Sequence, residues 1–271
     1  MTAPHDHAPH AAPAPAAPAG SSPRVALVTG ASQGIGRAIA EALLQQGWQV
    51  ALLGRSLPRL QAVLAGLPPA QAAAALPLQA DVTDAEAVAA AFAAVQARWG
   101  RLDLLFNNAG VFFASAPIDE TPLAAWRQSV DTNLTGMFLC LQQAFRLMKA
   151  QQPPGGRILN NGSVSAQVPR PNAVAYAATK HGVSGLTKAA ALEGRAWGIA
   201  VGQIDIGNVA TDMTAVMAAG MLQGDGSLRP EPRMPMERVV RTVMALVDLP
   251  LDANVLQTTI LATGMPFSGR G

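Results

Sequence analysis

The fold of this chain is constrained most by one feature near its start. An apolar segment leads into a glycine-rich turn, and a segment of helical spacing follows the turn. Residues 24–29 are mostly aliphatic, and Gly30, Gly34 and Gly36 follow with the spacing Gly-x-x-x-Gly-x-Gly before an Ala- and Leu-rich stretch begins. The glycines permit a tight turn and a close approach of the backbone to a phosphate, and the start of the helix offers unpaired N–H groups. The pattern predicts a phosphate-binding turn between a first strand and a first helix.

Short apolar segments alternate with longer segments of helical spacing along the rest of the chain. Strands are expected at 24–29, 49–53, 76–80, 102–106, 157–161, 200–205 and 255–261. Helices are expected near 35–46, 84–98, 122–149, 173–197 and 236–247. The strand segments are apolar on both faces, as in a parallel sheet that helices cover on both sides. The sequence therefore predicts an α/β fold with a Rossmann-type, doubly wound parallel sheet of about seven strands.

Composition disfavours several classes of protein. Charged residues make up 13% of the 271 residues and form no basic run, so nucleic-acid binding is not expected. We expect a soluble cytoplasmic protein, because the chain has neither an apolar stretch of about 18 residues nor a signal-peptide pattern. Three of the four histidines precede Ala11, and Cys140, the only cysteine, has apolar neighbours. A metal site, a histidine-based triad and a disulfide are therefore not expected.

Tyr176 is the only tyrosine of the chain, and Lys180 follows it by one helical turn. This spacing places the phenol and the ammonium on one helix face. A nearby ammonium stabilises phenolate and brings the tyrosine pKa from about 10 toward neutral pH. The pair therefore suits proton exchange with an alcohol or ketone oxygen, the alternative being a core tyrosine whose hydroxyl bonds to the lysine.

These motifs together resemble the short-chain dehydrogenase/reductase family. The resemblance covers about residues 24–262 and rests on Thr29-Gly-x-x-x-Gly-x-Gly, Asn107-Asn-Ala-Gly and Tyr176-x-x-x-Lys. It implies an NAD(P)-dependent enzyme with the catalytic residues Asn133, Ser163, Tyr176 and Lys180. In this family the catalytic serine precedes the tyrosine by 13 residues, which selects Ser163 over Ser165. Ser165 would then support the catalytic serine or cap a helix. Asn133 would hold a water linked to Lys180, the alternative being a local kink of its helix.

The resemblance also implies a set of cofactor contacts. These are Gly30, Ser32, Gln33, Gly34, Ile35, Gly36, Arg55, Asp81, Val82, Asn108, Ala109, Gly110, Tyr176, Lys180, Val209 and Thr211. NADP is expected over NAD, because Arg55 stands where a carboxylate would bind the ribose of NAD, and a guanidinium suits a 2′-phosphate. Two positions depart from the family. Gln33 replaces a basic residue found in many NADP-preferring relatives, and Ile206 replaces a proline that would fix a φ angle before Val209.

The substrate expected from this resemblance is a hydrophobic ketone, a 3-oxoacyl-type compound or the corresponding secondary alcohol. Apolar residues are expected around it, with Arg170 at the edge of the pocket: Val111, Phe112, Phe113, Val168 and Pro169. The alternatives are an NAD-dependent secondary-alcohol dehydrogenase, a catalytically silent nucleotide-binding scaffold and, with little room in the chain, an epimerase or dehydratase. Family members commonly assemble through the flanking helices, so a homotetramer or homodimer is expected.

Three parts are expected along the chain. Residues 1–23 form a disordered Ala/Pro/His-rich leader, residues 24–264 the catalytic domain, and residues 265–271 a tail that crosses a subunit contact or frays. Within the domain, residues 210–235 carry methionines among Gly and Pro. Long irregular segments at sheet ends often cover ligands, so this segment is expected to be a substrate lid, the alternative being a surface loop.

Overall fold

The computed structural model describes residues 23–113, 116–211, 214 and 220–267. All but the last residue of the expected leader lies outside these ranges. So do Met213 and Met217 of the expected lid and the last four residues of the expected tail.

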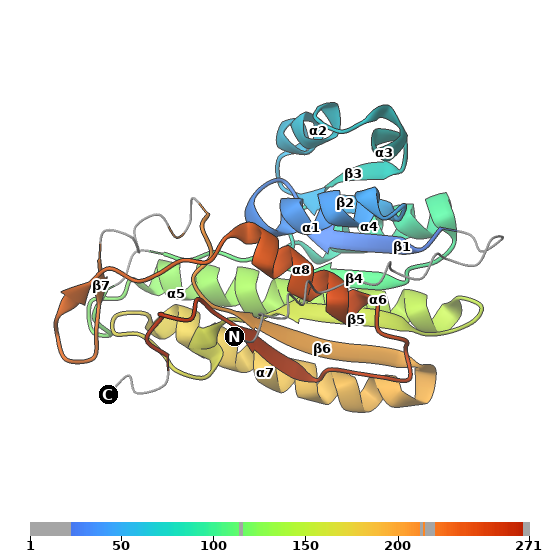
Figure 1. The fold of residues 1–271 in the computed structure, drawn as a ribbon. Helices are drawn as coiled ribbons and strands as arrows, with labels where there is room; N and C mark the ends of the chain where they lie inside the picture. The colour runs from blue at the N-terminus through green and yellow to red at the C-terminus, as the bar shows by residue number, and fades with distance from the viewer. Residues whose placement is uncertain (1–22, 114–115, 212–213, 215–219, 268–271) are drawn as a thin grey trace, which may run out of the picture.

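Seven strands form one parallel sheet with the order β3-β2-β1-β4-β5-β6-β9 (Figure 1). The strands are β1 (Val25–Thr29), β2 (Gln49–Gly54), β3 (Ala75–Gln79), β4 (Leu104–Asn107), β5 (Gly156–Asn161), β6 (Ile199–Ile206) and β9 (Gln257–Ile260). The strand order reverses between β1 and β4, and in such sheets ligands bind beyond the carboxyl ends of the strands at that point. The predicted doubly wound α/β fold is confirmed.

Helices cover both faces of the sheet (Figure 1). They are α1 (Gly34–Gln45), α2 (Leu57–Ala65), α3 (Pro69–Ala73), α4 (Ala85–Trp99), α5 (Leu123–Val130), α6 (Gly136–Ala150), α7 (Val174–Gly194) and α8 (Met236–Val247). Three short helical segments complete the set: the π-helix η1 (Asp131–Thr135) and the 3-10 helices η2 (Val164–Ala166) and η3 (Arg195–Trp197). α1, α2 and α8 pack on one face, and α4, α6 and α7 pack on the other.

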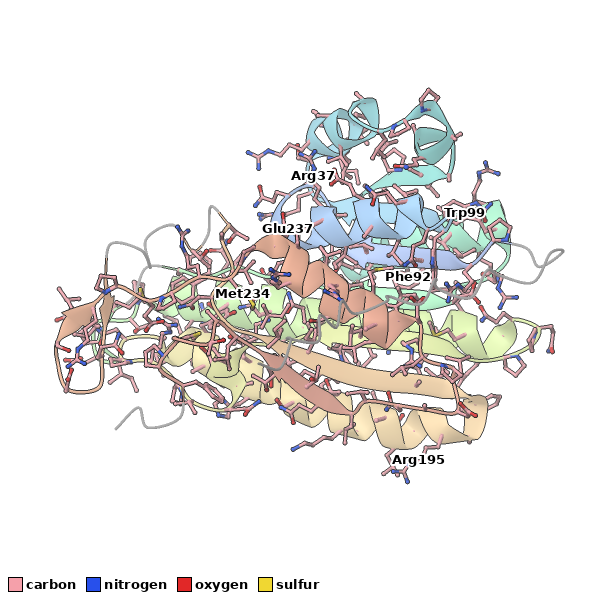
Figure 2. The ribbon with its side chains drawn as sticks, in the orientation of Figure 1. Arg37, Phe92, Trp99, Arg195, Met234 and Glu237 are labelled. Carbon is pink, nitrogen blue, oxygen red and sulfur yellow. The ribbon has the colours of Figure 1, made fainter. Side chains whose placement is uncertain are left out.

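The alternation of side chains along a strand explains why both faces are apolar. In β1, Ala26 and Val28 point into the core beneath α1 and α8, whereas Val25 and Leu27 point into the core beneath α4 and α6. Met234 belongs to the first of these cores and Phe92 on α4 to the second (Figure 2). Because neighbouring residues are buried on opposite faces, the strands read as continuous apolar runs.

The structure differs from the sequence prediction in three places. The expected long helix over 122–149 is one helical run of α5, η1 and α6, with a π-turn at its centre. α2 and α3 were not expected, although Ser56 caps α2 and a proline follows it. The expected lid contains a small antiparallel hairpin of β7 (Met221–Leu222) and β8 (Leu228–Arg229). In the ranges described, no helix combines the length and hydropathy that a membrane crossing needs.

Candidate active site

The glycine-rich turn joins β1 to α1 at the switch point of the sheet. Gly30 and Gly34 have φ angles of 66° and 55°, in the left-handed region that glycine adopts without a steric penalty. A Cβ atom on Gly36 would lie 2.4 Å from the main-chain oxygen of Gly30 and 2.6 Å from the Asn108 amide nitrogen. The absence of a side chain at Gly36 therefore lets α1 begin directly against the turn.

A second set of contacts fastens the end of β4 to the end of β1. The hydroxyl oxygen of Thr29 accepts hydrogen bonds from the backbone N–H groups of Asn108 (2.8 Å) and Ala109 (2.9 Å). The Asn108 amide nitrogen donates to the main-chain oxygen of Thr29 at 2.9 Å, and its oxygen accepts from the Asn161 amide at 2.8 Å. The side chain of Asn108 thus joins β1, β4 and β5 beneath the site.

A cavity of about 490 Å³ lies over these strand ends. It is lined by every expected cofactor contact except Gly36, whose role is to bring the helix close to the turn. Asn133 and Ser163, two of the expected catalytic residues, do not line it. Sequence reasoning missed several lining residues, among them Ser56, Arg59, Thr132, Asn161, Gly162, Thr214 and Met236.

Tyr176 and Lys180 come together at the wall of this cavity, as their spacing on α7 predicts. The Lys180 Nζ atom lies 5.6 Å from the centroid of the Tyr176 ring and donates a hydrogen bond to the main-chain oxygen of Asn161 at 2.8 Å. Burial lowers the pKa of Lys180 to about 8, opposed by the negative charge of Asp205. Lys180 therefore loses its charge at a pH well below that of an exposed lysine.

Ser163 is buried close to Tyr176, at the start of η2. Burial raises the pKa of Tyr176, and the hydrogen bond from the Ser163 side chain and the charge of Arg170 act in the opposite direction. The Ser163 hydroxyl oxygen also accepts from the backbone N–H of Ser165 at 3.1 Å, so Ser163 is the cap of the short helix. Ser165 takes part through its backbone.

Asn133 sits fully buried inside the π-helix η1. Its side-chain oxygen accepts from the backbone N–H of Val111 at 2.7 Å, and its nitrogen donates to the oxygen of the same residue at 2.9 Å. The nitrogen also approaches the Thr179 hydroxyl at 3.4 Å. Single π-turns are frequent at functional sites, and here the turn holds the loop after β4 next to α7. The expected water link to Lys180 stays a prediction.

The end of the cavity near β2 carries two arginines. Arg55 follows β2, and Arg59, one turn into α2, donates from its Nη1 atom to the Gln33 side-chain oxygen at 3.1 Å. Asp81, beyond β3, accepts from the backbone N–H and the hydroxyl of Thr83 at 3.0 and 2.9 Å. Asp81 is therefore a turn residue as well as a lining residue.

The cavity suits a dinucleotide in shape and in chemistry. A Cβ atom on Gly34 would meet nothing within 4 Å, so open space adjoins the turn where a pyrophosphate would bind. The Asn161 side-chain oxygen, in the wall near Lys180, is buried and has no hydrogen-bond partner, so it can accept from an amide or hydroxyl of a ligand. Arg55, Arg59 and Lys180 place cationic groups in the wall of the cavity, which suits an anionic ligand.

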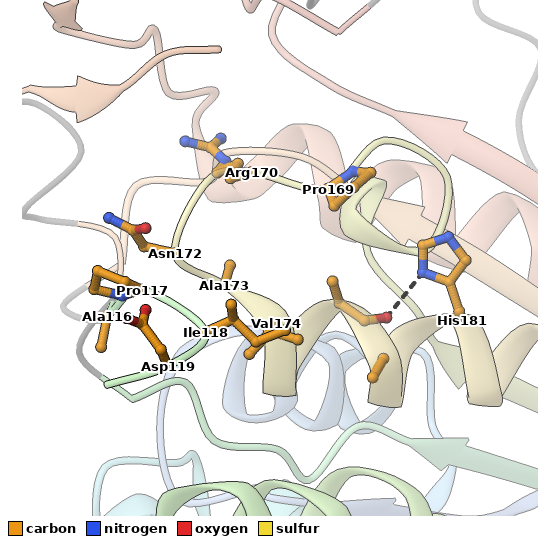
Figure 3. Close-up of a pocket in the computed structure, with 12 residues that line it drawn as sticks. Ala116, Pro117, Ile118, Asp119, Pro169, Arg170, Asn172, Ala173, Val174 and His181 are labelled. Carbon is orange, nitrogen blue, oxygen red and sulfur yellow. Dashed lines mark hydrogen bonds between the residues drawn. The ribbon is translucent and has the colours of Figure 1, made fainter. Parts of the chain in front are cut away.

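Apolar residues adjoin the catalytic pair on the side away from the glycine turn. The Phe112 ring meets the Tyr176 ring edge to face, with centroids 5.1 Å apart. A second pocket, of about 580 Å³, opens between α7 and the segment around Pro117, and Arg170 and His181 lie on its wall (Figure 3). Met234, expected in the apolar lid, is instead part of the core beneath α8.

Arg170 is held by an ion pair and is not a free charge at the pocket edge. Its Nη2 atom lies 2.5 Å from a carboxylate oxygen of Glu231 in the expected lid, and both side chains are buried. The Asn208 side chain binds both partners, accepting from Arg170 at 2.9 Å and donating to Glu231 at 2.6 Å. This cluster connects the segment after η2 with the expected lid.

The segment after β6 shows what replaces the usual proline. β6 continues through Ile206, which pairs with Ile260 of β9, and the Gly207 N–H donates to the oxygen of Ile260 at 2.8 Å. Met265 of the expected tail is buried, and its sulfur would lie 3.0 Å from a Cβ atom on Gly207. The first part of the tail therefore folds back onto its own chain.

Comparisons with known proteins agree with this geometry. The family model for short chain dehydrogenases matches residues 24–221. The chain is similar to a 3beta-hydroxysteroid dehydrogenase of Mediterraneibacter gnavus, with 36% identity over 82% of this chain and 79% of the relative. It is also similar to the 3-oxoacyl-[acyl-carrier-protein] reductase FabG of Staphylococcus aureus, with 39% identity over 71% and 77% of the two chains. An alcohol dehydrogenase of the archaeon Thermococcus sibiricus, solved with 5-hydroxy-NADP, superposes with a TM-score of 0.75, 26% identity and coverage of 88% and 96%.

Proposed function

The chain belongs to the short-chain dehydrogenase family and is an NAD(P)-dependent oxidoreductase of alcohol and carbonyl groups, and from this premise we propose that it transfers hydride between NADP(H) and a hydrophobic ketone or 3-oxoacyl-type compound. The observation that carries the proposal is the meeting of Tyr176, Lys180 and Ser163 beside a cavity that suits a dinucleotide.

Each residue has a separate task in the proposed reaction. A nicotinamide bound in the cavity would supply or accept the hydride. The Tyr176 phenol donates a proton to the carbonyl oxygen in reduction and takes it back in oxidation. The Ser163 hydroxyl binds the same oxygen, and the Lys180 ammonium favours the phenolate form of Tyr176 and holds the nicotinamide ribose. Asn133 keeps the loop at Val111 in place and takes part in proton supply.

Two arginines support the preference for NADP. Arg55 and Arg59 both line the end of the cavity near β2, and no carboxylate follows β2 directly. Arg59 supplies a basic group next to Gln33, which stands where many NADP-preferring relatives have a basic residue. A pair of guanidinium groups suits a 2′-phosphate, whereas a carboxylate would repel it.

The apolar wall and the relatives support a hydrophobic substrate. Phe112 packs on Tyr176, and the relatives include a hydroxysteroid dehydrogenase and a 3-oxoacyl reductase. Two observations support a lid role for segment 210–235. Thr211 and Thr214 line the cavity, and Glu231 forms an ion pair with Arg170.

A homotetramer or homodimer is also proposed. Large apolar side chains stay exposed on the flanking helices and on η3: Leu123, Trp126, Phe138, Leu192 and Trp197. Burial between subunits would remove these side chains from water. Sedimentation equilibrium of the full-length chain tests this, and a monomer at micromolar concentration contradicts it.

The function is tested by initial rates with NADPH and with NADH over a panel of aliphatic, cyclic, steroidal and 3-oxoacyl ketones. The proposal expects NADPH to be oxidised faster than NADH at equal concentrations. Faster turnover with NADH supports the NAD-dependent dehydrogenase instead. Tight binding of NADPH with no turnover of any ketone supports the silent scaffold.

A further inference from the structure

Asp205 is a buried carboxylate immediately behind the catalytic serine. It lies near the end of β6, has no exposed surface and does not line the cavity. Its Oδ1 atom accepts a hydrogen bond from the backbone N–H of Ser163 at 3.0 Å. Asp205 therefore contacts the catalytic segment without reaching the position of a substrate or cofactor.

Four donors surround the two oxygens of Asp205. Oδ1 accepts from Ser163 and from the Gln203 amide at 2.6 Å, and Oδ2 accepts from the amides of Gln167 (2.7 Å) and Gln257 (2.8 Å). A protonated carboxyl group would bring an O–H that also needs an acceptor, whereas an ionised carboxylate only accepts. The set of four donors therefore matches the charged form.

The orientation of Gln203 is set by a chain of hydrogen bonds deeper in the protein. The Asn160 amide donates to the Thr187 hydroxyl at 2.9 Å, and that hydroxyl donates to the Gln203 oxygen at 3.2 Å. Because its oxygen is occupied, Gln203 turns its nitrogen toward Asp205. This chain of hydrogen bonds therefore determines which end of the Gln203 amide faces the carboxylate.

Gly162 makes room for the carboxylate. A Cβ atom on Gly162 would lie 2.1 Å from the Asp205 Oδ1 atom and 2.6 Å from the Gln203 amide nitrogen. Any other residue at this position would collide with the cluster. On the outer side, Gln167 and Gln257 are exposed residues whose amides close the cluster toward solvent.

The charge of Asp205 acts on both members of the catalytic pair. It raises the pKa of Tyr176 and the pKa of Lys180. Of the other charges, Arg170 lowers the pKa of Tyr176, and Arg170 is itself paired with Glu231.

Several other titratable groups on and around α7 are exposed to solvent. Arg127 on α5, Asp131 on η1 and His181 on α7 are all exposed, and β9 and η2 carry no titratable side chain. Water screens exposed charges much more than buried ones. Asp205 is thus a buried negative charge that acts on both Tyr176 and Lys180.

We propose that Asp205 is a positioning residue that fixes the backbone of Ser163 and places a buried negative charge behind Tyr176, which favours the protonated donor that carbonyl reduction uses. This inference rests on the proposed function, because reduction needs a protonated tyrosine as the donor. Oxidation needs the phenolate and is expected to become efficient only at more alkaline pH.

The single tyrosine allows a direct test. Ultraviolet difference absorbance of tyrosinate, followed while the pH of the full-length protein is raised, reports Tyr176 alone, and Tyr176→Phe supplies the blank. Asp205→Asn is expected to lower the midpoint by about one pH unit, which is the scale of a charge interaction across a partly buried site. The asparagine keeps an oxygen for the Ser163 N–H and the Gln203 amide, and the exposed Gln167 and Gln257 side chains can turn their oxygens toward its nitrogen.

A surface variant keeps the test decisive if Asp205→Asn does not fold. Gln167→Lys places a cation beside Oδ2 and is expected to lower the same midpoint, whereas Gln167→Met, of similar length and without charge, is expected to leave it in place. Unchanged midpoints in both Asp205→Asn and Gln167→Lys would overturn the proposal.

The kinetic experiment separates this inference from the proposed function. The rate of NADPH-dependent ketone reduction is expected to fall at high pH as Tyr176 ionises, and in Asp205→Asn this fall begins about one pH unit earlier. If the wild-type protein reduces ketones and its profile coincides with that of Asp205→Asn, the role of Asp205 is wrong. If the wild-type protein reduces no ketone, the proposed function fails, and the tyrosinate titration still decides the role of Asp205.

Discussion

The Lys180 ammonium lies 5.6 Å from the centre of the Tyr176 ring and is tied by a 2.8 Å hydrogen bond to the oxygen of Asn161 at the end of β5. The bond fixes the ammonium between the sheet and the phenol. Burial at this point lowers the pKa of Lys180 to about 8. The positive charge of Lys180 is therefore present at neutral pH and lost at moderately alkaline pH.

This pKa predicts how cofactor affinity depends on pH. A lysine with a lowered pKa is an ammonium below about pH 8 and a neutral amine above it. The affinity for NADPH is expected to be constant below this value and to fall about tenfold above it, as a hydrogen bond to a charged group is lost. Titration calorimetry from pH 6.5 to pH 9.5 measures the change. Lys180→Met should bind weakly at every pH, and a wild-type affinity that stays level would rule out this role for Lys180.

Cofactor preference is expected to follow Arg55. Arg55→Asp replaces a cation with an anion where the 2′-phosphate is proposed to bind, so the KM for NADPH should rise at least tenfold while that for NADH changes little. Arg59→Ala should give a smaller rise, since Arg59 is shared with Gln33. Arg98→Asp, on the exposed end of α4, is the matched control for charge. Equal effects of Arg55→Asp on both cofactors would remove Arg55 from the phosphate site.

Asn133 is expected to contribute to stability as well as to activity. Asn133→Ala removes both hydrogen bonds to Val111 and leaves its backbone groups without these partners. The free energy of unfolding should fall by about 1–3 kcal/mol. Denaturant unfolding measures it, with Gln128→Ala on the exposed face of α5 as the control. A wild-type midpoint in Asn133→Ala would show that these bonds are dispensable.

Local patterns in the sequence were sufficient to predict the parallel sheet and the residues at the centre of the site. The glycine turn and the Tyr176–Lys180 pair depend on neighbours within one turn or one strand end, so their geometry is implied by spacing. The alternation of apolar runs likewise predicted the order of strands and helices, because each strand is buried on both faces. Sixteen of the chain's residues were expected at the cofactor, and only Gly36 does not line the cavity.

The rest depended on contacts between distant segments. Asp205 stands out in its strand only as a polar residue near Gln203, and the fold alone brings Ser163, Gln167 and Gln257 to it. The partner of Arg170, Glu231, lies 61 residues away in an irregular segment. Arg59 was missed because α2 was missed, although the sequence Ser56-Leu-Pro carries a recognisable helix start, with a cap and an early proline.

The central claim is that Tyr176 exchanges the proton in an NADPH-dependent carbonyl reduction. The most direct test compares the wild-type protein with Tyr176→Phe in stopped-flow or steady-state oxidation of NADPH with the best ketone of the panel. Tyr176→Phe should still bind NADPH and reduce the ketone about 10²- to 10⁴-fold more slowly, because the ring stays in the cavity wall and the proton donor is lost. A Tyr176→Phe variant that reduces the ketone at the wild-type rate would contradict the account.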